Sequence, residues 1–262
     1  MKSVRSPTLA ALKQKIKNIQ WAPGVKLLNF DANGLISIDK PAGMLAHPNS
    51  PKDISRSMIT SPYCLDQEMF TCKGADGRHQ NVWLLNRLDS ATSGVLLLSV
   101  CPDVAASVKD RFVQHQVDKC YRAIVFGTYK GRGVGVWRHK IATSKNERGQ
   151  LRSVVDEYSG LPTESRVALV KHMPGYGTPL SVLELAPVTG RTHQLRLHSA
   201  AHGHPIVGDS TYGDFSLNQM TKYFPNFEDR LYLHAHRVSL GYSLSGRAYS
   251  FSSESRLSTP FS

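Results

Sequence analysis

Cysteines, long apolar runs and acidic side chains are all scarce in this chain of 262 residues. The four cysteines include no C-x-x-C pair, so neither a disulfide framework nor a zinc ribbon is supported. The longest apolar run, Val95 to Val100, has the length of a strand, whereas a membrane span needs about 18 residues. The first residues lack the apolar region of a secretory signal. We therefore expect a cytoplasmic protein with reduced thiols and no membrane partner.

The 20 acidic residues are outnumbered by 32 lysines and arginines, which gives a formal net charge of +12. On a globular composition this excess indicates a polyanionic partner, most simply nucleic acid. The charge is concentrated in residues 1–30, which contain no acidic residue, and in residues 130–152, which contain one, Glu147. The glycines of 130–152 predict a mobile loop or an edge hairpin. Each segment is either an RNA-contacting arm or a solvated surface.

Short apolar runs with turn residues between them predict many strands and few helices. The spacing of Val104, Val108 and Phe112 by four residues predicts a helix starting at Pro102. Thr192 is the expected N-cap of a second helix that Gly203 ends. Residues 48–80 are predicted to be a loop with one short helix. The expected strands are 34–40, 82–85, 95–100, 119–127, 165–171, 180–186 and, as the last, 231–240. The chain is therefore assigned to the α+β class.

A polar island, N-R-L-D-S-A-T-S-G at residues 86–94, separates two of the apolar runs. Asp89 then lies on a loop at a strand end, where a side chain can meet a substrate. A nearby cation such as Arg87 would favour the ionised carboxylate, the form that acts as a nucleophile. The alternative is an Asx-turn or a surface ion pair.

The segment T-G-R-T-H-Q-L-R-L-H, residues 189–198, is rich in strong hydrogen-bonding groups. Arg191, His193 and Arg196 cannot all be buried without partners. Because His193 and Arg196 are three residues apart, they should share a helix face that could hold a carboxylate or a phosphate. The alternative is a solvated basic helix.

An aromatic side chain stands between basic ones in K-C-Y-R, residues 119–122. On a strand, Tyr121 would face away from Arg122, and its ring could stack on a base. The alternative is a core tyrosine.

Several other chemistries lack their motifs. The sequence contains no phosphate-binding P-loop, no G-x-S-x-G elbow and no zinc deaminase signature. The pair His202 and His204 has no third ligand nearby, so no metal is expected.

Taken in order, five segments resemble the RluA-type family of RNA pseudouridine synthases. The resemblance runs from about Leu35 to Leu240, with Asn86 where the family usually has His and Asp39 where Asn is common. The segments are I-D-K-P-A-G-M (38–44), N-R-L-D-S-A-T-S-G (86–94), K-C-Y-R-A with Gly127 (119–127), T-G-R-T-H-Q-L-R (189–196) and G-H-P-I-V-G-D (203–209).

The resemblance implies a pseudouridine synthase-like catalytic domain over residues 31–262, preceded by a basic arm, residues 1–30. Its fold would be a central mixed, mostly antiparallel sheet with flanking helices and an RNA-binding cleft. Its activity would be to isomerise a specific uridine in structured RNA, a tRNA or rRNA stem-loop, without cofactor or metal. A monomer with no obligate protein partner is expected.

The resemblance also assigns residue roles. Asp89 would be the catalytic carboxylate, adding either to the ribose C1′ or to the uracil ring. Tyr121 would stack on the flipped uracil and help remove the C5 proton, and Arg196 would pair with Asp89 and hold it ionised. Arg87 would fill the space left by the flipped base. Further RNA contacts are expected from Arg191, His193, Lys119 and Arg122.

Two other classes of function remain as alternatives. A non-catalytic RNA-binding protein or RNA chaperone could use the same scaffold, and loss of Asp89 would have indicated it. A nuclease would need clustered carboxylates for metal ions, and no such cluster accompanies Asp89.

Overall fold

The computed structural model describes residues 8–145, 151–175, 177–223 and 227–257, which divide into two units. Unit 1 comprises Met1–Asp118 and Arg237–Ser255, and unit 2 comprises Lys119–His236 and Arg256–Ser262. The boundary falls within the strand β12 (Leu233–Leu244), which contributes residues to both units.

Unit 1 is built on antiparallel strands. The pairs are β1 with β2, β2 with β6, β6 with β5, β5 with β4, β4 with β3, and β12 with β13. The β2–β6 register places Lys40 opposite Gly94, so residues 38–40 lie directly beside the start of β6. Its elements in chain order are α1 (Leu9–Lys17), β1 (Lys26–Phe30), β2 (Leu35–Lys40), η1 (Pro51–Arg56), β3 (Tyr63–Cys64), β4 (Met69–Lys73), β5 (His79–Leu84), β6 (Ser93–Ser99), α2 (Pro102–Val113), part of β12, and β13 (Arg247–Glu254).

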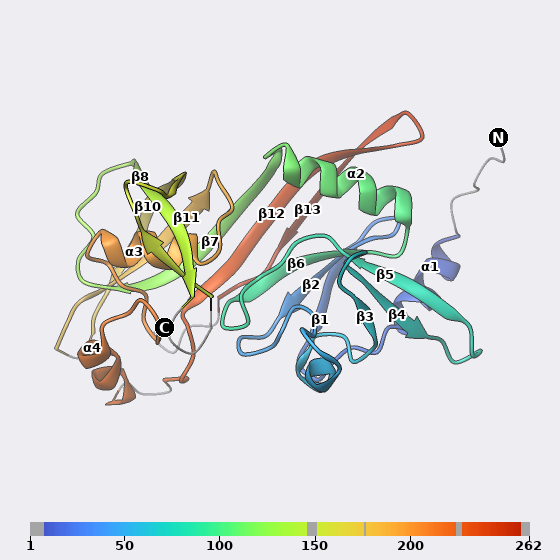
Figure 1. Cartoon of the computed structure of the whole chain (residues 1–262), viewed down its shortest axis with the longest axis horizontal. Helices are drawn as coiled ribbons and strands as arrows, with labels where there is room; N and C mark the ends of the chain where they lie inside the picture. Colours follow the sequence, from blue (N-terminus) through green and yellow to red (C-terminus); the bar gives the residue numbers. More distant parts are fainter. Residues whose placement is uncertain (1–7, 146–150, 176, 224–226, 258–262) are drawn as a thin grey trace. The chain divides into compact units, whose positions relative to one another are not determined.

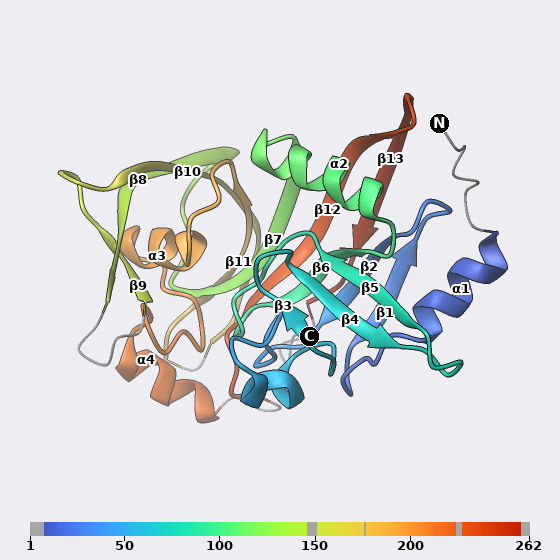
Figure 2. The same ribbon diagram turned by 45° about the vertical axis from the view of Figure 1, so that its right-hand side comes forward.

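The core of unit 1 lies under α2. Figures 1 and 2 both show this helix crossing β12 and β13. Its side chains Val104 and Val108 are fully buried and cluster with Leu97 of β6 and Phe251 of β13. The helix begins with Pro102 in its first turn, where the missing N–H costs nothing. The helix predicted from the spacing of four is therefore confirmed.

Unit 2 consists of antiparallel strands in the order β7–β11–β10–β8–β9, with α3 packed on β8, β9, β10 and β11. Figures 1 and 2 both show α3 beside β8 and β10. Both units therefore combine a few helices with antiparallel strands, which confirms the α+β class. The elements are β7 (Val117–Phe126), β8 (Val134–Lys145), β9 (Leu151–Val155), β10 (Leu161–Met173), β11 (Leu180–Pro187), α3 (Gln194–Ala201), α4 (Phe215–Met220), η2 (Thr221–Tyr223) and the first residues of β12.

The described part of the basic N-terminal segment belongs to unit 1. Helix α1 is capped by the Thr8 hydroxyl and buries Leu12 and Ile16, while its lysines remain exposed. Strand β1 follows and pairs with β2. Residues 1–7 lie outside the described residues, and the RNA contact expected of this segment stays a prediction.

For the basic segment 130–152 the sequence predicted a mobile loop or an edge hairpin, and the structure shows the edge hairpin. Strand β8 pairs with β10 on one side and with β9 on the other, and β9 is the last strand of the order in unit 2. Residues 146–150 lie outside the described part of the chain.

Three local predictions were wrong. Strand 231–240 is not the last, because β12 turns at Ser245 and Gly246 into β13; both residues have positive φ, as a tight two-residue hairpin turn requires. The predicted loop 48–80 contains β3, β4 and the start of β5 as well as η1. The N-cap of α3 is His193 rather than Thr192, since His193 adopts the left-handed conformation with φ of 55°.

Within the described residues, no helix combines the length and apolarity needed to cross a membrane.

Candidate active site

The Asp89 turn connects β5 to β6 in unit 1. The backbone N–H of Thr92 donates to the carbonyl of Asp89 (3.0 Å), which closes the turn. Asp89 is partly buried and Arg87 is exposed, so the island presents one half-sheltered carboxylate and one solvated cation. Asn86 accepts a hydrogen bond from the backbone N–H of Leu97 (2.8 Å). The residue that departs from the family pattern therefore holds the base of the turn to β6 through its side-chain oxygen.

Lys40 stabilises the Asp89 turn through hydrogen bonds from its ammonium group. Its side chain has no exposed surface, and its ammonium donates to the carbonyls of Pro41 (2.9 Å), Met44 (2.8 Å) and Ser90 (3.1 Å). The backbone N–H of Gly43 also donates to the Ser90 carbonyl (2.8 Å). The motif at 38–44 is thus bonded to the residue that follows Asp89. Sequence reasoning quoted Lys40 without giving it a role, although a lysine ending an apolar strand before Pro-Ala-Gly was a usable signal.

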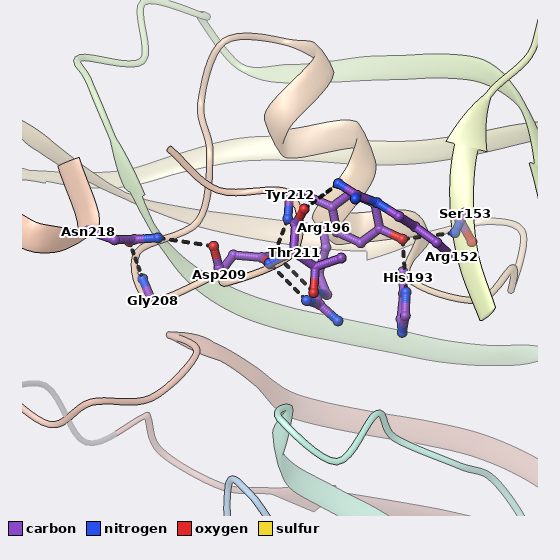
Figure 3. Close-up of polar contacts among 9 residues, drawn as sticks. All are labelled: Arg152, Ser153, His193, Arg196, Gly208, Asp209, Thr211, Tyr212 and Asn218. Carbon is purple, nitrogen blue, oxygen red and sulfur yellow. Dashed lines mark hydrogen bonds and ion pairs between the residues drawn. The ribbon is translucent and has the colours of Figure 1, made fainter. Parts of the chain in front are cut away.

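In unit 2, α3 carries Arg196 into a buried ion pair (Figure 3). Arg196 is 6% exposed and Asp209 is 2% exposed. The guanidinium donates from Nε to Oδ2 (2.8 Å) and from Nη2 to Oδ1 (2.7 Å), which is the two-bond geometry of a strong arginine–carboxylate pair. The backbone N–H groups of Thr211 and Tyr212 also donate to Oδ1. Burial alone would raise the pKa of the Asp209 carboxyl, but the hydrogen bonds and charge of Arg196 hold it below its usual range.

Tyr212 covers this pair. The Arg196 guanidinium lies 5.1 Å from the centre of its ring. Its hydroxyl accepts the backbone N–H of Ser153 (2.9 Å) and lies 2.9 Å from Nδ1 of His193. Tyr212 therefore contacts both His193 and Arg196, but the predicted shared helix face is wrong, because α3 begins at Gln194 and His193 precedes it. The carboxylate that Arg196 holds is that of Asp209. Sequence reasoning did not assign a role to Asp209 or Tyr212.

The start of the T-G-R-T-H-Q segment is held by Gln194, which is buried. Its Oε1 accepts from the Thr189 hydroxyl (2.8 Å) and from the Arg191 backbone (3.1 Å). Its Nε2 donates to the Glu164 carbonyl and to the Ser165 hydroxyl, both at 2.9 Å. The Arg191 side chain is exposed. The motif thus combines a structural glutamine with an exposed arginine that is available to a ligand.

The K-C-Y-R segment lies on β7, opposite β11. Arg122 stands across from Glu184 and forms an ion pair with it (2.9 Å), so this cation already has an acidic partner. Tyr121 is half-buried beside it. Lys119 is also partly buried, and desolvation lowers the pKa of its ammonium.

The predicted site residues therefore fall into two sets. Unit 1 contains Asp89 and Arg87, and unit 2 contains the others. The expected pairing of Arg196 with Asp89, and the expected orientation of Tyr121, stay predictions. The described residues contain no group of three or more histidines, cysteines or carboxylates suited to a metal ion.

Comparison with known proteins defines the class. The family described as RNA pseudouridylate synthase matches residues 34–201. A tRNA pseudouridine synthase C of Vibrio parahaemolyticus is 35% identical over 214 residues, which cover 76% of this chain and 78% of that protein. A protein of the same name from Pasteurella multocida is 36% identical, covering 78% of this chain and 81% of its own length.

The fold comparison agrees. The structure of human RNA pseudouridylate synthase domain containing 1 superposes with a TM-score of 0.64 over 88% of this chain and 84% of that one, at 23% identity. The chain therefore shares the fold of this pseudouridylate synthase domain. The chain belongs to the RNA pseudouridylate synthase family: it is an isomerase that converts uridine in RNA to pseudouridine.

Proposed function

We propose that this enzyme modifies a uridine in a tRNA stem-loop and that Asp89 is its catalytic carboxylate. The observation that carries the proposal is the Asp89 turn itself. The turn holds a half-buried carboxylate between β5 and β6, and the residue after Asp89, Ser90, accepts a hydrogen bond from the buried Lys40. Such fixed placement suits a group that must meet a reacting carbon at a defined distance and angle.

Asp89 acts on the N-glycosidic bond. In the isomerisation the bond between uracil N1 and ribose C1′ breaks, the uracil turns, and C5 bonds to C1′ in its place. The C5 proton is then lost, and N1 gains one, so the product is an isomer of the substrate. The carboxylate adds either to C1′ or to the uracil ring, and both routes need it ionised.

Three other residues complete the proposed site. Arg196 stabilises the ionised Asp89, Tyr121 stacks on the uracil and assists loss of the C5 proton, and Arg87 occupies the place of the flipped base. Base flipping costs a few kcal/mol of stacking, which an arginine plane and an aromatic ring can replace. Arg191, which is exposed, supplies a further contact to the RNA.

The substrate class is inferred from the relatives. The similar curated proteins are named as tRNA pseudouridine synthases, and they match most of this chain. The net charge of +12 is consistent with binding a phosphate backbone. We expect the enzyme to act as a monomer without a protein partner.

The test is pseudouridine mapping by carbodiimide adduct and primer extension. Total RNA is taken from a strain that lacks the gene and is complemented with wild type, Asp89→Ala or Asp89→Asn. Asp66→Asn is the matched control, because Asp66 is an exposed aspartate of the same unit. We expect a tRNA site restored by wild type and Asp66→Asn only. Restoration by Asp89→Ala would remove Asp89 from the mechanism, and a restored site in rRNA alone would refute the tRNA assignment.

A further inference from the structure

Tyr212 receives contacts from three separate segments of unit 2 (Figure 3). From β9, the Ser153 backbone donates to its hydroxyl, and the Arg152 guanidinium lies 5.3 Å from the ring centre. From the α3 segment come His193 at the hydroxyl and Arg196 at 5.1 Å from the ring centre. The third segment is its own turn, in which its backbone N–H donates to Asp209 (3.0 Å).

Two guanidinium groups thus share one aromatic ring. Like charges repel at such spacing, and two features offset this. The ring attracts both cations, and Asp209 supplies one negative charge. Arg152, unlike Arg196, is exposed, so its charge is accessible to an anion.

Arg152 is also bonded to the turn that holds Arg196. It donates from Nη2 to the carbonyl of Thr211 (2.5 Å), and the Thr211 N–H donates to Asp209 (2.9 Å). On the other side, the Ser153 hydroxyl donates to the carbonyl of Thr192 (2.6 Å), just before α3. Strand β9 is therefore hydrogen-bonded to both segments that position Arg196.

We propose that Tyr212 is a positioning residue that connects the basic β8–β9 hairpin to Arg196, so that an RNA phosphate bound at Arg152 fixes the orientation of the Arg196 guanidinium for reaction. The proposal rests on the role of Arg196 in the proposed function. It assigns Arg152 a part in the chemical step in addition to a part in binding.

The first test removes the hydroxyl and then the ring. Tyr212→Phe keeps the ring over Arg196 but loses the hydrogen bonds to Ser153 and His193. Tyr212→Leu loses the ring as well as these hydrogen bonds. With enzyme in excess over a tRNA substrate carrying tritium at uracil C5, single-turnover release of tritium measures the chemical step. We expect Tyr212→Phe, which loses two hydrogen bonds, to slow it about tenfold, and Tyr212→Leu to slow it further. RNA affinity, measured by filter binding, should change by less than about threefold.

Tyr158→Phe is the matched control, since the Tyr158 side chain is fully exposed, and it should leave the rate unchanged. Thermal unfolding is recorded for every variant, so that a rate loss counts only where the melting curve matches wild type. A wild-type rate in a folded Tyr212→Leu protein would overturn the proposal.

The second test separates positioning from binding. Arg152→Gln is made in wild type and in the Tyr212→Leu background. In the wild-type background we expect Arg152→Gln to lower the single-turnover rate at saturating enzyme. In the Tyr212→Leu background, which lacks the ring, it should not lower that rate further. If Arg152→Gln weakens binding equally in both backgrounds and leaves the saturated rate unchanged, Arg152 is a binding residue only and the proposal is wrong. Failure of the proposed function is distinct, because the wild type itself would then release no tritium.

Discussion

Replacing Asp209 by Asn should destabilise unit 2 strongly, because the carboxylate is buried against a buried arginine. Asp209 accepts two hydrogen bonds from Arg196 and two from the backbone of Thr211 and Tyr212. Asparagine has the same shape and can keep its oxygen for the two backbone groups. The bond from Arg196 Nη2 to that oxygen can then persist, but the amide N–H of Asn faces the Nε–H of Arg196, which loses its counter-charge at 6% exposure.

The magnitude follows from the cost of an unpaired buried charge. Breaking a buried ion pair by removing one partner costs about 3–5 kcal/mol. Since Asn preserves the backbone bonds, we place Asp209→Asn at the lower end, about 3 kcal/mol. Removing the arginine charge as well, as in Arg196→Met with Asp209→Asn, should cost less than the single change, because Asn keeps the two backbone bonds and no charge is left buried.

The assay is urea unfolding followed by tryptophan fluorescence. Trp137 lies in unit 2, whereas Trp21 and Trp83 lie in unit 1 and can be replaced by Phe to leave one reporter. Asp229→Asn, at an exposed aspartate of unit 2, is the control and should stay within about 0.5 kcal/mol of the parent. A loss below about 1 kcal/mol for Asp209→Asn would refute the reasoning.

The Arg196–Asp209 ion pair also predicts how the free energy of unfolding depends on pH. The folded pKa of Asp209 lies below its ordinary value, so its contribution to stability is present at neutral pH and is lost as the pH falls through the folded pKa. The stability difference between the parent and Asp209→Asn should therefore narrow in acid. A difference that stayed constant or widened would show that the carboxylate charge is not its origin.

Two further predictions concern other buried groups. Lys40→Met should lower the free energy of unfolding of unit 1 by about 3 kcal/mol and speed hydrogen exchange at Gly43, because three carbonyls lose a charged donor; unchanged exchange would contradict the anchoring role. Burial, with the nearby His139 and His202, lowers the pKa of His198 from 6.5 to about 4. Between these two pH values only the unfolded chain binds the proton, so the free energy of unfolding of the wild type should fall by at most about 3 kcal/mol as the pH drops from 6.5 towards 4. His198→Gln should flatten that slope in urea unfolding, whereas the exposed control His79→Gln should keep it; equal slopes in all three proteins would refute the assignment.

The structure supplies a reason for the low pKa of His198. The Thr163 hydroxyl donates its proton to the carbonyl of His139 (2.6 Å), so it must accept from Nε2 of His198 (2.8 Å). The other ring nitrogen, Nδ1, is buried and has no hydrogen-bond partner among the described residues. Protonation would place an unsatisfied N–H there, which favours the neutral ring.

Much of the fold was predictable where local pattern decides it. Helix α2 follows from Pro102 and the spacing of Val104 and Val108, and both are fully buried as expected. The missed strand β13 had a readable signal in the dipeptide Ser245-Gly246, which turns with two positive φ angles. The cap of α3 was not readable, because a left-handed histidine is held by its tertiary contact to Tyr212 rather than by propensity.

The sequence by itself was enough to indicate the family and its activity, because five motifs in order resemble the RNA pseudouridine synthases and the basic charge favours an RNA partner. Those features are short-range, so they can be read without coordinates. Only the tertiary structure decided the partners of the motif residues. Arg196 is bonded to Asp209, 13 residues away, the Lys40 ammonium reaches Ser90, and Ser153 reaches Tyr212 across 59 residues. Such pairs depend on strand register and loop path, which bring distant groups together and leave no local pattern in the chain.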